Sequence, residues 1–500
     1  MMTRNEKLSY LFRTVFPVQL GILLFVYVLA RAILLPITHD ESNTCLTYST
    51  MSVHDIVTYE RPIPNNHILN TLLIKLSASI FGMHPFSARL PNVLGFILYF
   101  TIVVLFTRKV TNDAIVTFFG ICAMVCNPYL LDFFSLARGY ALSISFMMTG
   151  IYFAWLFLQR QKDKYLALAV LFGMLAVYTN FTTLNFYAAL IALLGIATFQ
   201  MKLQMRGEHK KWVQTLARQW FILLIGSLML AGASYIPISK MVATDQFVYW
   251  GTNGFYKDTV LTLLYASQYN VPYFHLHAEV FSYLLAGIVG VMVFCAMLLL
   301  IKNRTGWYKN AQVFFMALFI FTIIVNVLQF YLVHTPYLTS RTALFFYPLM
   351  ALNFIFFAEW LRAYSPLSRF YFSLPLTALA LLHLSRSANL TSCFEWWYDA
   401  DTYKVMNYLE SEHRKTNLPI SLNCSWWFFP SLNFDIVTKN KDWITLAPFH
   451  QDFEPKRDAL YMYYYTTSDD TKHLAASYDT VLSLGWNSRF LMRKKETINE

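Results

Sequence analysis

The sequence predicts a polytopic α-helical membrane protein that carries a small α/β domain in its C-terminal part. The 500 residues are 57% hydrophobic and only 13% charged, which is far too apolar for a soluble protein of this size. Apolar runs long enough to cross a bilayer recur along the chain up to about residue 384. Residues 385–500 are instead polar, with 13 Lys and Arg against 15 Asp and Glu.

Eleven apolar runs approach the length of about 20 residues that a spanning helix needs. They lie near residues 15–37, 88–107, 114–131, 139–158, 165–179, 181–200, 219–237, 280–301, 312–333, 342–359 and 370–384. The fifth and sixth are separated only around Asn180, and Pro91 suits the first turn of the second. Residues 1–384 are therefore expected to form a transmembrane domain.

Lys and Arg residues between the runs predict the orientation. With the N-terminus in the cytoplasm, the inner segments hold 18 of them and the outer loops six. We therefore expect an integral protein of the plasma (inner) membrane, with a cytoplasmic N-terminus and an exoplasmic or periplasmic C-terminal domain. The net charge of +11 is explained by attraction to anionic membrane lipids, and the basic residues form no compact stripe that would predict nucleic-acid binding.

The first outer loop, residues 38–86, carries an unusual set of polar residues. Thr38-His39-Asp40-Glu41 follows directly on the first apolar run, so a carboxylate pair is placed beside the hydrocarbon edge. Two prolines force an extended stretch near 60–67, which ends in Asn66 and His67. Apolar residues then recur with helical spacing over 68–81, which predicts an amphipathic helix at the membrane interface.

Other ionisable residues gather at the outer ends of the predicted helices. Arg138 lies in Ser135-Leu136-Ala137-Arg138-Gly139-Tyr140, and Arg341 lies in Thr339-Ser340-Arg341-Thr342. The later spans are almost free of charge, whereas transporters bind substrates at midplane polar sites. This distribution favours chemistry at the outer surface.

The C-terminal segment, 385–500, predicts a small exoplasmic α/β domain. Asp401 and Thr402 can cap a helix with Tyr403, Met406 and Leu409 on one face. Strand-like runs follow at 418–427, 442–449, 458–467 and 479–493. Cys393 and Cys424 could form a disulfide, which the sequence alone does not decide.

A carboxylate and arginines at one membrane surface suit transfer of a sugar from a phosphate carrier. The carboxylate can take the proton of the acceptor hydroxyl, and guanidinium groups can stabilise the departing phosphate. The prenyl tail of such a carrier can stay in the lipid while its phosphate rises to the interface.

Four motifs in order along residues 15–360 resemble the C-type (GT-C) glycosyltransferases. They are the carboxylate pair after the first span, an outer loop with interfacial helices, Ala-Arg-Leu-Pro before the second span, and Ala-Arg-Gly-Tyr at the head of a later one. Within that class the chain is similar to the protein O-mannosyltransferases and bacterial aminoarabinose transferases, as a bacterial-type member.

The resemblance implies a hexosyl- or pentosyltransferase that uses a polyprenyl-phosphate sugar donor and a lipid, glycan or protein acceptor. Asp40 would be the catalytic base and Glu41 its neighbour in the site. Residues toward the donor phosphate would be Arg138, Arg341, His67, Asn66 and Arg61. The chain departs from the relatives' His-Pro-Pro or Lys-Pro-Pro element, and it lacks the inserted β-trefoil domain of the eukaryotic protein mannosyltransferases, which argues against their type of protein acceptor.

Several alternatives remain open from the residues alone. The acidic pair could cap a loop helix, and Arg138 and Arg341 could extend to lipid headgroups. No cofactor is required, but a divalent metal held by His39, Asp40, Glu60 or the pair His275 and His277 is an alternative. The chain could also be a transporter or flippase of lipid-linked glycans, or a membrane scaffold without catalysis.

Overall fold

The computed structural model describes residues 4–203, 209–246, 251–271, 278–304, 306–449, 459–465, 474–485 and 489–495. The chain divides into two compact units. The helical unit comprises Met1–Leu29, Ser52–Leu73 and Arg89–Ala388. The mixed unit comprises Ala30–Met51, Ile74–Ala88 and Asn389–Glu500. Part of the first loop thus belongs to the same unit as the C-terminal segment.

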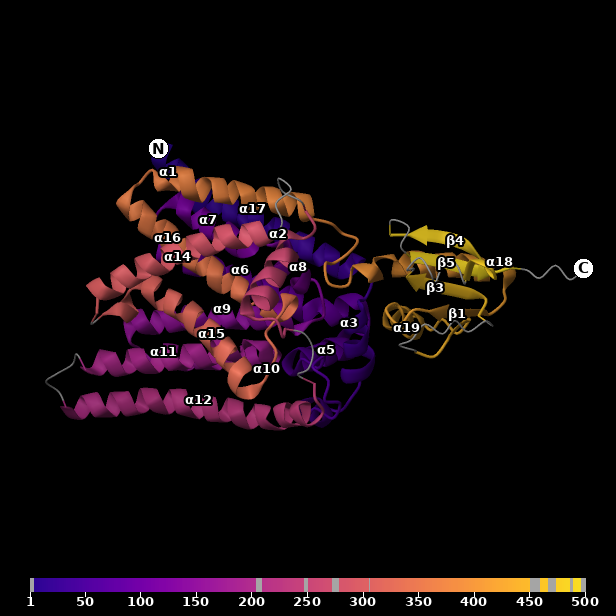
Figure 1. Ribbon diagram of the computed structural model, residues 1–500, viewed down its shortest axis with the longest axis horizontal. Helices are drawn as coiled ribbons and strands as arrows, with labels where there is room; N and C mark the ends of the chain where they lie inside the picture. Colours follow the sequence, from indigo (N-terminus) through magenta and orange to yellow (C-terminus); the bar gives the residue numbers. More distant parts are fainter. Residues whose placement is uncertain are drawn as a thin grey trace, which may run out of the picture. The chain divides into compact units, whose positions relative to one another are not determined.

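Helices make up the chain before residue 389, and neighbours such as α11 and α12 pack side by side (Figure 1). Their bounds are α1 (Arg4–Tyr10), α2 (Phe16–Leu34), α3 (His39–Asn43), α4 (Val53–Val57), α5 (Ile68–Phe81), α6 (Pro85–Val110), α7 (Ala114–Val125), α8 (Pro128–Phe134), α9 (Gly139–Arg160), α10 (Asp163–Thr179), α11 (Leu184–Leu203), α12 (His209–Ala243), α13 (Thr262–Gln268), α14 (Ala278–Lys302), α15 (Ala311–Val333), α16 (Phe346–Tyr364) and α17 (Leu374–Ser387).

The protein is an integral membrane protein. In the described ranges, 7 helices are long and apolar enough to span a bilayer, or up to 8 if the bent pair α7 and α8 forms one span. All eleven predicted runs fall on helices. Three of them do not reach the same measure, because α10 and α17 are shorter than 18 residues and α16 carries Asn353, Glu359 and Arg362 among its apolar residues.

The third predicted run is broken where proline interrupts the helix. α7 ends at Val125, and α8 begins at Pro128 after a bend of 62°. Proline cannot donate the backbone hydrogen bond that would continue α7, whereas it fits the first turn of a new helix. The Asn127 side chain accepts from the backbone N–H of Leu130 at 3.0 Å and caps that new helix.

The prediction that Pro91 lies in the first turn of the second span is wrong. α6 begins six residues earlier, at Pro85, and Pro91 lies inside it. Ser87 explains the earlier start, because its hydroxyl accepts from the backbone N–H of His84 at 3.1 Å and satisfies an N–H at the helix start. The helix over 68–81 is confirmed as α5, although its place at a membrane interface stays a prediction.

The C-terminal segment of the mixed unit forms the predicted α/β structure (Figure 1). Its elements are α18 (Thr402–Thr416), β1 (Ile420–Cys424), α19 (Phe429–Thr438), β2 (Ile444–Leu446), β3 (Tyr461–Tyr465), β4 (Tyr478–Leu484) and β5 (Arg489–Lys494). The strand order is β2-β1-β3-β5-β4. β1 is parallel to β2 and β3, whereas β5 is antiparallel to β3 and β4.

Two details of this segment differ from the sequence prediction. The run 479–493 is not one strand, because β4 and β5 lie within it as an antiparallel pair, with Gly485 at φ +53° after β4. Asp401 precedes α18 but does not cap it with its side chain. That carboxylate instead pairs with the guanidinium of Arg489 at 2.6 Å.

The Cys393–Cys424 disulfide is not formed. Cys424, the last residue of β1, has an unbonded thiol. Burial raises the pKa of this thiol well above its usual value, which keeps it protonated and unreactive.

Gly139, the first residue of α9, allows two segments to approach closely. A Cβ at this position would lie 2.7 Å from the carbonyl oxygen of Thr179 and 2.9 Å from Cβ of His67. Because a backbone oxygen cannot move aside easily, no larger residue fits without a shift of the backbone.

We therefore expect Gly139→Ala to lower stability by about 1–3 kcal/mol. The thermal unfolding midpoint in detergent measures this change. Gly195→Ala in α11 is the matched control, because no heavy atom lies within 4 Å of its added Cβ. Equal midpoints for the two variants would contradict the packing argument.

Candidate active site

Three side chains from distant parts of the chain form a basic cluster in the helical unit: His67, Arg138 and Arg341. Arg138 is 2% exposed and directly precedes α9. Its Nη1 donates to the carbonyl oxygen of Asn65 at 3.4 Å, and its guanidinium carbon lies 5.9 Å from the ring centre of Tyr140. These contacts tie the start of α9 to the loop before α5.

His67 is the second buried member of the basic cluster. It is 6% exposed, and its ring meets the ring of Tyr140 edge-on at 5.0 Å. Burial lowers the pKa of His67 well below its usual 6.5, and the positive charges of Arg138 and Arg341 lower this pKa further. The imidazole is therefore neutral, and its Nε2 has no hydrogen-bond partner among the described residues.

Arg341 comes from a short 3-10 helix, η6 (Ser340–Ala343), between α15 and α16. The turn is fixed locally, since the backbone N–H of Thr339 donates to Oγ1 of Thr342 at 2.8 Å. Arg341 is half-buried, and its charge acts on His67. The structure thus brings together three of the residues that the sequence singled out for a donor phosphate.

Asn66 and Arg61, the other two residues that the sequence analysis placed toward the donor phosphate, lie in the loop before α5. The Asn66 side chain is committed to its own loop, because its Nδ2 donates to Ile56 O at 3.0 Å and its Oδ1 accepts from Thr71 at 3.0 Å. These bonds show that Asn66 shapes its own loop, while its role toward a donor phosphate stays a prediction. Arg61 lies on an exposed stretch of the same loop, and its contact with a donor phosphate stays a prediction.

Two buried amides that the sequence analysis did not single out support the basic cluster. Nδ2 of Asn70, on α5, donates to the carbonyl oxygen of Ala137 at 3.3 Å. Oδ1 of Asn70 accepts from Asn92, on α6, at 2.9 Å. Both amides are fully buried, so they fix the residue before Arg138. The sequence signal that could have identified Asn70 is its place as a polar residue inside an otherwise apolar helix.

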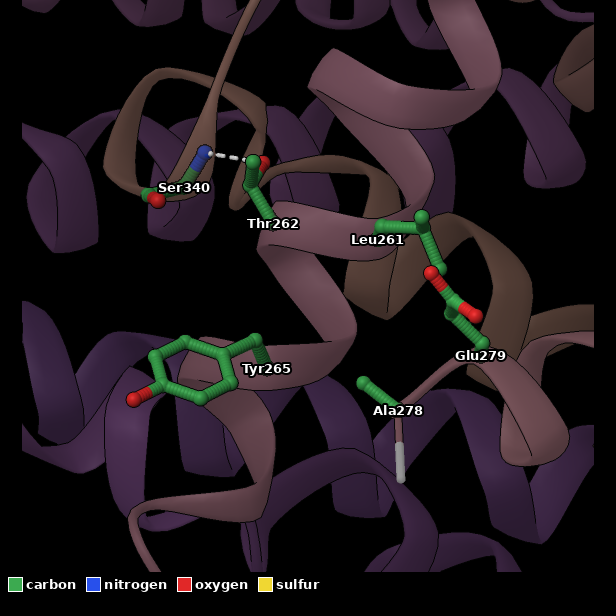
Figure 2. Close-up of a pocket in the computed structure, with 6 residues that line it drawn as sticks. All are labelled: Leu261, Thr262, Tyr265, Ala278, Glu279 and Ser340. Carbon is green, nitrogen blue, oxygen red and sulfur yellow. Dashed lines mark hydrogen bonds between the residues drawn. The ribbon is translucent and has the colours of Figure 1, made fainter.

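A cavity of about 510 Å³ opens beside the segment that carries Arg341 (Figure 2). It is lined by Leu261, Thr262, Tyr265, Ala278, Glu279 and Ser340. Figure 2 shows the hydrogen bond that joins its walls, in which the Ser340 N–H donates to Oγ1 of Thr262 at 2.8 Å. The cavity wall and Arg341 are therefore held by the same turn.

The carboxylate pair of the first loop lies in α3, within the mixed unit. Glu41 is fully buried, and its Oε2 accepts from the backbone N–H of Thr38 at 2.9 Å. Glu41 thus caps the helix, as the structural alternative anticipated. Asp40 is half-buried, so its carboxylate is the more accessible of the two.

A third carboxylate, Asp399, completes an acidic cluster with Asp40 and Glu41. Asp399 is 2% exposed, and its Oδ2 accepts from the backbone N–H of His39 at 2.7 Å. Burial raises the pKa of Asp399 well above its usual value, and the charges of Glu41 and Asp40 add to that rise against the opposing hydrogen bond from His39. Its Oδ1 has no partner among the described residues. Nothing near Asp399 in the sequence marked it.

Further hydrogen bonds hold the first loop to the C-terminal segment in the mixed unit. Ser431 donates to Ile37 O at 2.7 Å, and Ser42 donates to Pro430 O. Arg31, fully buried at the end of α2, donates to the carbonyl oxygens of Asn389 and Ser392 at 2.6 and 2.9 Å. The helix that carries Asp40 is therefore held by hydrogen bonds to the C-terminal segment.

The described residues contain no group of three or more His, Cys, Asp or Glu side chains that could hold a metal ion. His275 and His277, one alternative pair of ligands, lie outside those ranges.

Protonation of His67 should destabilise the folded protein. The unfolded His67 takes up a proton as the pH falls below about 6.5, whereas the folded form resists it, so stability is lost as the pH falls from that value toward the lowered folded pKa. The unfolding midpoint of the wild type should drop more between about pH 7.5 and about pH 5.5 than that of His67→Gln. Parallel profiles for the two proteins would refute this assignment.

No protein-family model matches the chain, and no curated protein matches it by sequence. Among solved structures, ArnT from Cupriavidus metallidurans bound to undecaprenyl phosphate is similar at 10% identity and a TM-score of 0.48, covering 97% of this chain and 98% of that one. The apo state of ArnT gives 11% identity and a TM-score of 0.47, over 95% and 97% of the two chains. A likeness at this level does not by itself assign a function to the present chain.

Proposed function

We propose that this protein transfers a sugar from a polyprenyl-phosphate donor to an acceptor on the exoplasmic face of the membrane. The observation that carries the proposal is the basic cluster of His67, Arg138 and Arg341 in a protein otherwise built from apolar helices. We further propose that residues 385–500 form an exoplasmic or periplasmic domain of an inner-membrane protein whose N-terminus is cytoplasmic.

The basic cluster suits the phosphate of a lipid carrier. Arg138 and Arg341 both act electrostatically on His67 and lower its pKa, so two guanidinium groups stand near one imidazole. Guanidinium groups offer forked donors that match phosphate oxygens. The Nε2 of His67 is buried and has no hydrogen-bond partner among the described residues, so it is a third group that can bond to a phosphate oxygen. The cavity of about 510 Å³ beside Ser340 is the candidate site for the sugar of the donor, while the prenyl tail stays in the lipid.

Asp40 is the best candidate for the base. Glu41 is buried and committed to its helix cap, and Asp399 is buried with a raised pKa, which leaves Asp40 as the more accessible carboxylate of the acidic cluster. In the proposed step the acceptor oxygen attacks the anomeric carbon and its proton passes to Asp40. The bond from that carbon to the phosphate oxygen breaks, and the electron pair leaves with polyprenyl phosphate.

Removing one arginine should weaken donor binding. We expect Arg138→Gln and Arg341→Gln each to raise the Kd for farnesyl phosphate about tenfold or more, because a charge-assisted hydrogen bond contributes about 1.5–3 kcal/mol. Isothermal titration in detergent measures the Kd. Arg160→Gln is the matched control, since Arg160 ends the helix that Arg138 precedes. A phosphate affinity untouched by both substitutions would exclude the basic cluster as the donor site.

Removing the base should stop transfer but not binding. We expect Asp40→Asn to slow release of radiolabel from polyprenyl-phosphate mannose or glucose about a hundredfold or more in native membranes, which supply the acceptor. Farnesyl phosphate should bind as before. Asp55→Asn, another carboxylate of the first loop, is the control and should transfer normally. Transfer that persists in Asp40→Asn would remove the assignment, and lipid-linked sugar flux across proteoliposomes that survives this change would favour a flippase.

A further inference from the structure

An aromatic cluster in the mixed unit lies beside the acidic cluster and has no part in the donor site. It consists of Trp397, Tyr398, Trp426, Trp427 and Tyr465. Their rings form a continuous series in which each contacts the next. The ring centroids of Tyr465 and Trp397 are 5.8 Å apart, and those of Trp397 and Tyr398 are 6.0 Å apart. The separation is 4.7 Å between Tyr398 and Trp427 and 4.9 Å between Trp427 and Trp426.

Three of these rings are open to solvent, and the buried ring of Tyr398 joins Trp427 to Trp397 and Tyr465. Trp397 is 41% exposed, Trp427 39% and Tyr465 42%. Single exposed aromatic residues are ordinary, but a connected set of exposed rings on a polar domain marks a binding surface.

His39 connects the aromatic cluster to the carboxylates. Its ring meets Trp426 edge-on at 5.6 Å and Tyr398 at 6.5 Å, and its Nδ1 lies 3.1 Å from the carbonyl oxygen of Trp427. The next residue along the chain is Asp40, and the backbone N–H of His39 itself donates to Asp399. Exposed aromatic faces and carboxylate oxygens therefore adjoin within one unit.

We infer that the aromatic cluster and Asp399 form a subsite for a carbohydrate, so that the acceptor of the proposed transfer is a glycan. That the bound glycan is the acceptor rests on the proposed function. Carbohydrate binding by the subsite does not. A sugar ring has one apolar face of C–H groups, which packs on indole or phenol faces, and hydroxyls on its edge that need acceptors. Oδ1 of Asp399, buried and without a partner among the described residues, is such an acceptor.

The charges beside the cluster favour a sugar over a membrane surface. Aromatic residues also gather at membrane interfaces, where Lys and Arg accompany them toward anionic headgroups. The aromatic cluster instead adjoins the carboxyl side chains of Asp40 and Asp399, which offer anionic headgroups no cationic partner. The guanidinium of Arg489 lies 5.3 Å from the Trp397 ring centre and already pairs with Asp401.

The test measures sugar binding to the purified full-length protein without any donor. The probes are methyl α-D-mannoside, methyl β-D-glucoside and N,N′-diacetylchitobiose, each followed by saturation-transfer-difference NMR. We expect ring C–H signals from at least one probe, and an affinity about fivefold or more weaker in Trp427→Ala. Asp399→Asn, which can still accept from His39, should weaken binding about tenfold.

Trp443→Ala is the matched control in the same unit. Trp443 stacks on His413 at 4.6 Å and lies outside the aromatic cluster, so its loss should leave sugar binding unchanged. Unfolding midpoints establish that each variant is folded.

Two results would overturn the inference. One is the lack of a signal from all three glycosides, or equal affinity in the wild type and Trp427→Ala. The other is quenching of wild-type fluorescence by brominated lipids in proteoliposomes that is lost in Trp427→Phe, which would assign the cluster to the bilayer surface. Because no donor is present, loss of farnesyl phosphate binding or of transfer would count against the proposed function and leave this result intact.

Discussion

The hydrogen bond from the backbone of His39 to the buried carboxylate of Asp399 is the interaction on which the mixed unit depends. It joins residues 360 positions apart and fixes the start of the short helix that carries Asp40. A helix of five residues has no stability of its own in water. Its position therefore comes from Asp399, from the cap by Glu41 and from the serine contacts with α19.

In the helical unit, a charged side chain, Arg138, is buried among apolar helices. His67 stays neutral because it is buried next to two guanidinium groups, while the amides of Asn70 and Asn92 hold the backbone on which Arg138 stands. Most of these groups have named partners, as buried polar groups need. The fold thus places two guanidinium groups near a buried imidazole.

The fold and part of the candidate site could be predicted from the sequence because their signals are local. Apolar length marks the spans, and an arginine at the end of an apolar run marks Arg138 and Arg341. The features that the sequence did not reveal depend on hydrogen-bond partners, some distant in the sequence and some close to it. Pro91 lies inside α6 because Ser87 and His84 start the helix earlier, and Asn66 turns inward because Ile56 and Thr71 take its amide. Asp399 escaped notice since only the folded chain brings it to His39.

Three helices, α2, α5 and α6, pass without interruption from one unit into the other. The C-terminal segment is consequently not a detachable module. A chain truncated after Ala388 would keep Ala30–Met51 and Ile74–Ala88 but lose the carbonyl oxygens that receive Arg31 and the carboxylate that receives His39. Arg31 would lose these two hydrogen bonds and His39 would lose its carboxylate acceptor, so removing the segment would disturb the region around Asp40.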